Sequence, residues 1–180
     1  QMGWATRCAE MHQHLFGRLD IHRKTVIPWL DELLTLAGAR ILELGSGTGS
    51  SALSLAEQGA SVCGVSLGEK EIAIARMRFE IYGLAHDFRA MNAADIGIHF
   101  DEASFDCVIF SASLEHMLIT ERLQALQSAW RLLRKDGLLV VFVLAMSLPG
   151  LGQSTHDIRG VDFEFIPDTV YAAPGDTIIF

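Results

Sequence analysis

The 180-residue sequence lacks any basic run, and its 14 lysines and arginines are outnumbered by 22 aspartates and glutamates. The formal net charge of -8 would repel a phosphate backbone, so no nucleic-acid partner is expected. The longest apolar run, residues 137–150, is broken by proline and glycine and is too short to span a bilayer. We therefore expect a small-molecule substrate and no membrane span, while the oligomeric state stays open.

Cysteine is scarce as well. Cys8, Cys63 and Cys107 have no spacing typical of a metal site, and the last two lie in apolar runs where a thiol behaves as a small hydrophobe. An odd count without a disulfide framework indicates a reducing compartment, so we expect a cytoplasmic protein. His12 and His14 would face different directions on a helix, so we expect no metal site.

Half of the residues are hydrophobic and the mean hydropathy is +0.29, which fits a parallel sheet buried on both faces. Apolar runs that predict strands alternate with segments of helical period. This order predicts an α/β fold: a Rossmann-like, doubly wound, mostly parallel sheet with helices on both faces. The predicted strands are 40–44, 61–65, 88–91, 105–110 and 138–144, and the predicted helices are 4–37 (ending at Gly38), 50–58, 67–82 and 119–134.

The stretch ELGSGTGSS joins the first predicted strand to the next helix. Gly45, Gly47 and Gly49 allow a sharp turn and a close approach of the backbone to a ligand, and the free N–H groups of a helix N-terminus favour an anionic group. Ser50 departs from the dinucleotide fingerprint, and no Walker lysine follows the glycines. Glu43, at the end of the strand, would repel a pyrophosphate but suits a cofactor that carries a positive charge.

Four segments, in order, resemble the class I S-adenosylmethionine-dependent methyltransferases over about residues 20–145: ILELGSGTGSSALSLAEQGASVCGVS, NAADIGIHF, SFDCVIFSASLEHM and AWRLLRKDGLLVVFV. The resemblance implies S-adenosyl-L-methionine as the cofactor and transfer of its methyl group to a small molecule, with an O, N or C acceptor left open. It also implies that Gly45, Ser46, Gly47 and Gly49 cradle the amino-acid end of the cofactor, with Glu43 near its ammonium group.

The second strand of this family usually ends in an acid that binds the ribose, and here that position is Ser66, followed by Leu67. The spacing of Ser66 and Glu69 predicts a capping box at the start of a helix, which we favour. Alternatively, Glu69 replaces the missing acid at the ribose. Either way, Ser66 can still make one hydrogen bond to a ribose oxygen.

The second and third of these segments supply further candidates. The resemblance implies that Asn92 and the amide of Ala93 read the adenine edge. Asp95 would serve if the loop register differed, and an Asx turn is the structural alternative for Asn92.

The segment that follows the fourth strand would lie beside the methyl group, beginning at Ser111. His116 would then be the general base, helped by Glu115, unless the two residues only start a helix. Asp106 is expected to have a structural role.

The whole chain, residues 1–180, reads as a single methyltransferase-like domain. Its parts are a helical N-terminal lid (1–38), a cofactor-binding core (39–145) and a C-terminal edge region (146–180) with short antiparallel strands. The start at Gln1 and the end inside DTIIF favour a truncated chain. Phe16, Arg18 and His22 are candidate lid residues, and residues 154–160 are either part of an acceptor pocket or an exposed loop.

Two other functions remain open. Ser66 and the short C-terminal region favour a cofactor-binding domain without catalysis, in which the site has degraded. An NAD-dependent oxidoreductase is the third candidate, and Ser50 and Ser66 count against it.

Overall fold

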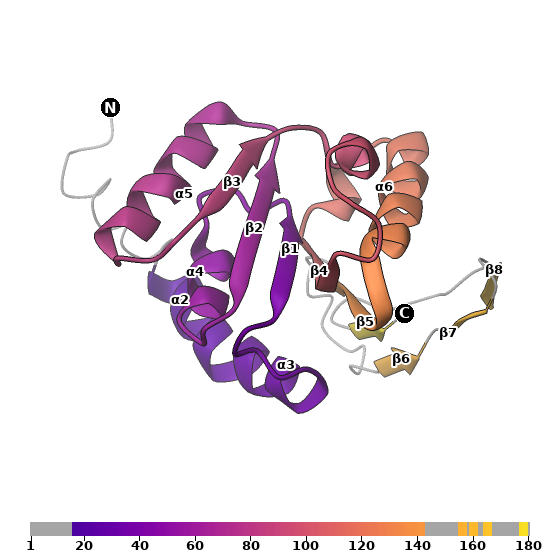
Figure 1. The fold of residues 1–180 in the computed structure, drawn as a ribbon, viewed down its shortest axis with the longest axis horizontal. Coiled ribbons are helices and arrows are strands. Elements are labelled where there is room, and N and C mark those ends of the chain that lie inside the picture. Colours follow the sequence, from indigo (N-terminus) through magenta and orange to yellow (C-terminus); the bar gives the residue numbers. More distant parts are fainter. Residues whose placement is uncertain (1–15, 143–154, 158, 162–163, 167–176, 180) are drawn as a thin grey trace, which may run out of the picture.

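A central parallel sheet organises the molecule (Figure 1). The computed structural model describes residues 16–142, 155–157, 159–161, 164–166 and 177–179. Seven strands form one sheet in the order β3-β2-β1-β4-β5-β9-β6, and the first five are parallel to one another. This arrangement confirms the predicted doubly wound α/β fold. These strands are β1 (Arg40–Leu44), β2 (Ser61–Ser66), β3 (Asp87–Ala90), β4 (Phe105–Ser111), β5 (Leu133–Phe142), β6 (Thr155–Asp157) and β9 (Thr177–Ile179).

The C-terminal strands extend the sheet beyond β5. Strand β9 pairs antiparallel with β5, and β6 pairs parallel with β9. A separate two-stranded antiparallel sheet joins β7 (Arg159–Val161) to β8 (Glu164–Ile166). The division of the chain into lid, core and edge regions stays a prediction.

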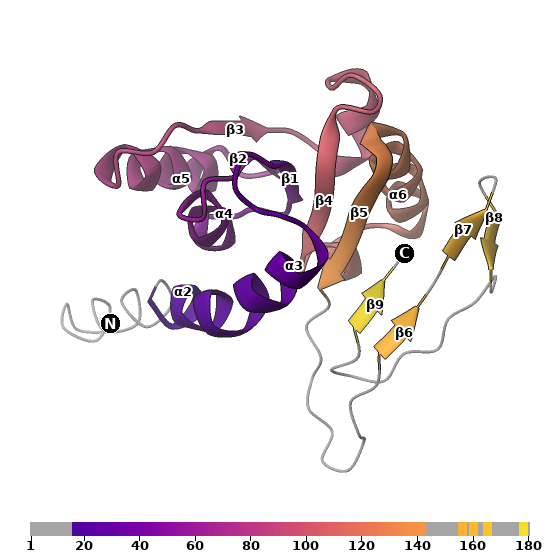
Figure 2. The same ribbon diagram turned by 60° about the horizontal axis from the view of Figure 1, so that its bottom comes forward.

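Helices cover both faces of the sheet (Figure 2). One face carries the N-terminal helices together with α4 and α5, and the other carries α6 and the 3-10 helix η3. The bounds are α2 (Arg18–Ile21), the π-helix η2 (His22–Val26), α3 (Ile27–Leu33), α4 (Ser50–Ala56), α5 (Glu69–Ile81), η3 (Ala93–Ile98) and α6 (Ile119–Leu132).

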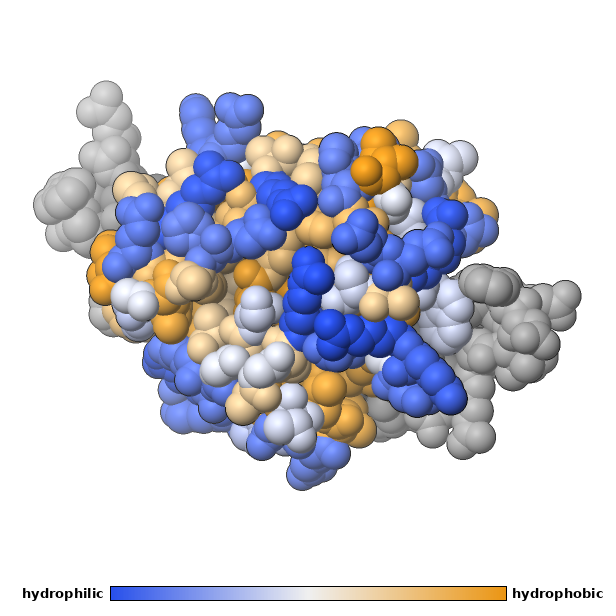
Figure 3. All heavy atoms as spheres, in the orientation of Figure 1, coloured by the Kyte–Doolittle hydropathy of each residue, from blue (hydrophilic) through white to orange (hydrophobic). Residues whose placement is uncertain are grey.

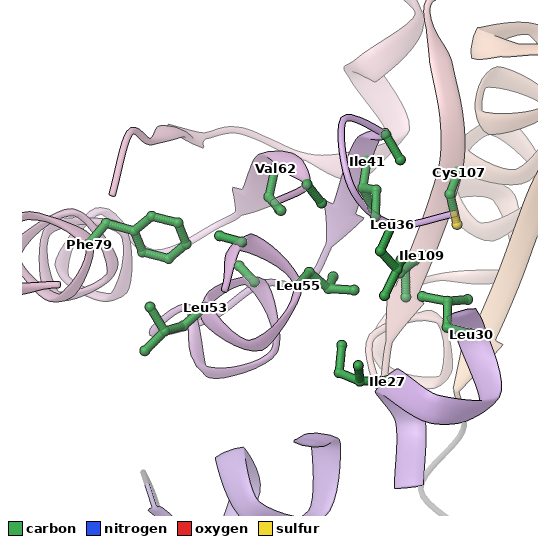
Figure 4. Packing of buried hydrophobic residues seen from close by; sticks show 14 of the residues in the cluster. Ile27, Leu30, Leu36, Ile41, Leu53, Leu55, Val62, Phe79, Cys107 and Ile109 are labelled. Atoms are coloured by element: carbon green, nitrogen blue, oxygen red, sulfur yellow. The ribbon is translucent and has the colours of Figure 1, made fainter. Parts of the chain in front are cut away.

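Alternation along the strands divides the core into two layers. Ile41 of β1 joins the layer under α3 and α4, whereas Leu42 and Leu44 join the layer under α6. Figure 4 shows the first layer, in which Ile27 and Leu30 of α3 belong to the same buried cluster as Ile109 of β4. By the same alternation, Glu43 points to the face covered by α4 and the N-terminal helices.

Two predicted boundaries are wrong. The helix predicted to end at Gly38 ends at Leu33, because Leu34 adopts an extended backbone (φ -148°, ψ 128°). The buried Leu36 then belongs to the connection into β1. Strand β5 begins at Leu133 rather than at residue 138, because Leu133 pairs with Phe105 before a shift of register.

Figure 3 shows a face of the molecule where hydrophilic residues are interspersed with apolar ones. Cys63 and Cys107 are buried free thiols, and burial raises the pKa of each to about 12. Within the described residues, no helix has the length and hydropathy needed to cross a bilayer, and no three His, Cys, Asp or Glu side chains are grouped to hold a metal ion. Cys8, His12 and His14 lie outside the described residues.

Asp106 joins three strands near their amino ends. One carboxylate oxygen accepts a hydrogen bond from the backbone N–H of Arg40 at 2.7 Å. The other accepts a hydrogen bond from the guanidinium of Arg134 at 2.6 Å, which ties β5 to the same point. These contacts give Asp106 a structural position at the end of the sheet opposite to the carboxyl ends of the strands.

Replacing Asp106 with alanine is expected to lower the free energy of unfolding by about 1–3 kcal/mol, because hydrogen bonds to a charged group are lost and the Arg40 amide loses its acceptor. Urea unfolding measures the change as a lower midpoint with an unchanged slope. The exposed Asp101→Ala variant is the control and should stay within about 0.5 kcal/mol of the parent. Equal midpoints for the two variants would contradict this role.

Candidate ligand-binding site

Two cavities, each of about 270 Å³, open beside the carboxyl ends of β1, β2 and β4. The strand order reverses between β1 and β4, and ligands of open α/β sheets bind at such a point. We call them the Glu43 cavity and the Asn92 cavity, after one residue in the lining of each. Gly45 and Ala112 line both, so the two cavities meet over these residues.

The glycine loop, as we call the segment from Gly45 to Gly49, is fixed at its start by hydrogen bonds to strand β2. The amides of Gly45 and Ser46 both donate to the carbonyl of Val65, at 2.8 and 3.0 Å. Gly45 has φ +83°, and a Cβ there would lie 2.7 Å from the hydroxyl of Ser113, which itself donates to the Leu44 carbonyl at 2.8 Å. Glycine is therefore required at position 45 by both backbone conformation and space.

The middle of the loop is more open. Gly47 also has a left-handed backbone (φ +51°), but the nearest described atom to a Cβ built there is the Gly45 carbonyl oxygen at 4.0 Å. Gly49, with φ +78°, is the N-cap of α4. Among the described residues, neither Gly47 nor Gly49 is part of either cavity lining, although Gly45, beside position 47, lines both.

Arg78 of α5 fixes the second half of the loop. Its guanidinium donates to the carbonyl and hydroxyl oxygens of Thr48, at 2.6 and 2.7 Å, and to the hydroxyl of Ser50 at 3.2 Å. Burial lowers the pKa of this partly buried arginine. Sequence reasoning missed Arg78, because a basic residue in the last turn of a helix is usually read as a helix-end charge.

Glu43 is the most unusual group of the site. Its side chain is 0% exposed, and neither carboxylate oxygen has a hydrogen-bond partner among the described residues. Desolvation raises its pKa. The opposing influence of Ser111, Ser51 and the Ala52 amide is smaller, and none of these groups makes a hydrogen bond of ordinary geometry to it. A buried, unpaired carboxylate beside a cavity favours a cationic ligand group.

The N-terminal helices form the opposite wall of the Glu43 cavity, where Arg18 and His22 both lie. The ring of His22 packs edge-on against Phe142, and its Nδ1 is buried without a partner in the part of the chain that the structure describes. Burial and, secondarily, the charge of Arg18 lower the pKa of His22, which favours the neutral imidazole. Phe16, the third predicted lid residue, lies outside the lining of both cavities formed by residues 16–142.

The predicted capping box of Ser66 and Glu69 is wrong. Ser66 is the last residue of β2, where it pairs with Ala90, and the N-cap of α5 is Gly68. Ser66 and the exposed Leu67 line the Asn92 cavity. Glu69 is exposed in the first turn of α5 and, within residues 16–142, is outside the lining of both cavities.

Asn92 and Ala93 line the cavity as the sequence expects. The side-chain oxygen of Asn92 accepts from the Ala94 amide at 3.0 Å, so the Asx turn is present. Its side-chain nitrogen donates to Glu121 of α6 at 2.9 Å, and Glu121 also lines the cavity. Sequence reasoning missed Glu121, whose only signal was its place three residues after the helix N-cap. Asp95 lies in η3, and its amide donates to the Asn92 carbonyl at 3.0 Å.

The segment after β4 closes the site. Ser111 lines the Glu43 cavity, and Ala112 follows with a left-handed backbone (φ +45°) that is uncommon for a residue other than glycine. The 3-10 helix η4 (Leu114–His116) then places the exposed His116 at the Asn92 cavity. Glu115 is half-buried in η4 and, among the described residues, is not part of either lining.

This arrangement can hold an extended ligand with two unlike ends. A cationic end would meet Glu43, and a flat, partly apolar end would enter the Asn92 cavity between Leu67, Met91 and Met117. The middle of such a ligand would cross Gly45 and Ala112. Ala112, which follows β4, would then lie beside its centre, whereas His116 lines the Asn92 cavity.

A comparison with known protein families matches residues 42–141 to the methyltransferase domain. A ubiquinone biosynthesis O-methyltransferase of Pseudomonas aeruginosa (strain PAO1) is 29% identical over 147 residues, covering 74% of this chain and 62% of that protein. The PH0226 protein of Pyrococcus horikoshii OT3 is 26% identical, with a TM-score of 0.64 over 72% of this chain and 55% of that one.

The [4+2]-cyclase SpnF is also similar, being 28% identical with a TM-score of 0.58 over 64% of this chain and 43% of that one. The match thus spans less than two thirds of each of these relatives.

The buried carboxylate predicts a pH dependence of stability. Because the folded-state pKa of Glu43 is raised above its ordinary value of 4.5, its contribution is fully present below that pH and is lost as the pH rises through the folded-state pKa. Glu43→Gln removes this loss, so the stability of the variant relative to the parent should increase above pH 4.5. Urea unfolding of the ligand-free proteins between pH 4 and 8 measures the difference. A difference that does not change with pH would show that Glu43 titrates normally, and the exposed Glu102→Gln variant is the control.

Proposed function

Because the chain belongs to the methyltransferase domain family, we propose that it transfers a methyl group from S-adenosylmethionine to a small-molecule acceptor. The observation that carries this proposal is the buried carboxylate of Glu43, which has no hydrogen-bond partner within residues 16–142 and lies beside a cavity at the switch point. The amino-acid end of S-adenosylmethionine carries an ammonium group that matches this carboxylate. The pyrophosphate of NAD would instead be repelled there.

The remaining residues fit the same cofactor. In the Glu43 cavity, Arg18 offers a positive charge to the carboxylate of the amino-acid end. In the Asn92 cavity, Ser66 offers a hydroxyl to the ribose, and Asn92 and Ala93 lie where the adenine edge would be read. The contact between the two cavities at Gly45 and Ala112 suits a ligand that enters both.

When bound, S-adenosylmethionine supplies an electrophilic methyl group on a sulfonium centre. The chain has to orient that centre and exclude water from it. Gly45 and Ala112, which line both cavities, would lie beside that centre, and the Ala112 amide donates to the Phe142 carbonyl at 2.9 Å. His116 would accept the proton of an acceptor hydroxyl while the methyl–oxygen bond forms, the methyl–sulfur bond breaks and S-adenosylhomocysteine is left, with Glu115 beside His116 in sequence.

The acceptor class is a further part of this proposal. The Pseudomonas relative is named as an O-methyltransferase, so we propose a hydroxyl oxygen as the acceptor atom. The net charge of -8 argues against a nucleic-acid acceptor. A cytoplasmic location is proposed as well, and the free thiols of Cys63 and Cys107 support it.

A second candidate function is cofactor binding without methyl transfer. The family acid at the ribose is replaced by Ser66, which can supply only a neutral hydrogen bond. The similarity to a [4+2]-cyclase also indicates that this fold supports chemistry of another kind. Turnover measured as S-adenosylhomocysteine release, with a panel of hydroxyl acceptors, separates the two functions.

Cofactor binding is tested with Gly47→Asn. Asparagine tolerates the left-handed backbone at position 47. Its Cβ would lie 4.0 Å from the carbonyl oxygen of Gly45, which lines both cavities, and its side chain would extend into the open space there. We expect calorimetry to show that the parent binds S-adenosylhomocysteine and that the variant binds it at least tenfold more weakly, a difference of about 1.4 kcal/mol or more. Gly83→Asn is the matched control, because Gly83 has φ +66° and open space after α5. A parent that does not bind S-adenosylhomocysteine would refute the proposed cofactor.

The catalytic role of His116 is tested by its replacement with alanine. If His116 takes the acceptor proton, turnover at saturating acceptor should fall by roughly 100-fold or more, while the affinity for S-adenosylhomocysteine changes little. Unchanged turnover in His116→Ala would assign the residue to the wall of the Asn92 cavity alone.

A further inference from the structure

Glu121 brings a carboxylate into the Asn92 cavity from the far side of the sheet. It lies in the first turn of α6, which packs on the face opposite to α5. One of its oxygens accepts from the side-chain nitrogen of Asn92 at 2.9 Å, and the other accepts from the Leu118 amide at 3.2 Å. Glu121 is half-buried, and a carboxylate has room for about four hydrogen bonds, so it can accept more from a ligand.

The contacts of Asn92 fix the direction of its amide. The Ala94 backbone N–H can only donate, so it requires the amide oxygen of Asn92. The carboxylate of Glu121 can only accept, so it requires the amide nitrogen. Both neighbours select the same orientation, and turning the amide over would place two donors together and two acceptors together.

The wall beside Asn92 therefore presents acceptors to a ligand. The free lone pairs are those of the Asn92 side-chain oxygen and of the Glu121 carboxylate, while the amide nitrogen already donates to Glu121. An exocyclic amine brings two donors and satisfies such a wall. A carbonyl oxygen in the same place would face acceptors only, and a binding site rejects a ligand that leaves its polar groups unpaired.

We propose that Glu121 makes the cavity selective for a 6-aminopurine nucleoside over its 6-oxo counterpart, by accepting a hydrogen bond from the exocyclic amine and holding the Asn92 amide. This inference rests on the proposed function, which places the adenosyl group in the Asn92 cavity. It assigns an acid to the nucleoside end of the site, where Ser66 supplies none. Glu69, the acid that the sequence offered for this end, is exposed and lies outside the cavity lining formed by residues 16–142.

The experiment compares two ligands that differ only at this position, S-adenosylhomocysteine and S-inosylhomocysteine. Calorimetry gives the ratio of their dissociation constants for the parent, Glu121→Gln, Glu121→Asp and the exposed control Glu102→Gln. In the glutamine variant, the side-chain oxygen can accept from Asn92. The nitrogen then cannot accept from the Leu118 amide, but it can donate to a 6-oxo group. The aspartate variant keeps the carboxylate, and the ratio cancels any general loss of folding that affects both ligands.

We expect the parent and Glu102→Gln to prefer the adenosyl ligand by at least 10-fold, since a hydrogen bond to a charged group typically accounts for about one to two powers of ten. Glu121→Gln should reduce the ratio by roughly tenfold, chiefly through tighter binding of the inosyl ligand, whereas Glu121→Asp should keep most of it. Melting temperatures of the free proteins show the separate effect on the cap of α6.

Each of the other outcomes contradicts a specific part of the inference or of the proposed function. If the parent binds S-adenosylhomocysteine and Glu121→Gln leaves the ratio unchanged, Glu121 has no role in selectivity, while the proposed cofactor stands. An equal loss of both ligands in Glu121→Gln reduces Glu121 to a helix cap and likewise overturns the inference. If the parent binds neither ligand, both the inference and the proposed function fail.

Discussion

The site depends on the place where the chain leaves the central strand β1. The connections from β1 and β4 pass to opposite faces of the sheet, so the carboxyl end of β1 cannot be covered by a crossing chain. The loop that starts at Gly45 turns away from the sheet at this point. It is held by the Val65 carbonyl on one side and approached by Ser113 on the other. Gly45, which these two contacts hold, lines both cavities.

The loop is held at both ends by residues that are far from it in the sequence. Arg78, thirty residues after Thr48, binds the second half of the loop, whereas Ser113 lies against its first residue. Helix α5 and the segment after β4 thus determine the shape of one short loop. A ligand that contacts the loop is consequently sensitive to the packing of both elements, although neither is adjacent to it in the chain.

Strands and the glycine loop could be predicted from the sequence because their signals are local. The segment from Arg40 to Leu44 has three large apolar residues and is followed by a glycine, and the structure places β1 at those residues. The interpretation of Ser66 failed for a different reason. A serine three residues before a glutamate is a good capping pair in isolation, but the pairing of Ser66 with Ala90 keeps the residue in the sheet. Tertiary hydrogen bonds decided between two locally acceptable structures.

The contacts of the site were harder to predict. Asn92 was identified by its position after a strand, yet its partner Glu121 comes from a helix 29 residues later. No periodicity relates the two residues, since their meeting follows from the packing of α6 against η3. The same limit applies to Glu115 and His116. These neighbours both lie in η4, yet among the described residues only His116 lines a cavity.

The unpaired state of Glu43 has a thermodynamic consequence for any cationic ligand. A carboxyl whose pKa is raised by burial holds its proton to a higher pH than usual, and an ammonium group placed beside it would lower that pKa again. Association then releases a fraction of a proton to the solvent. The heat of association would include the ionisation heat of the buffer, and the apparent affinity would rise with pH until the carboxyl is fully charged. Binding of a cation beside a buried carboxyl that keeps part of its protons is thus coupled to the release of protons.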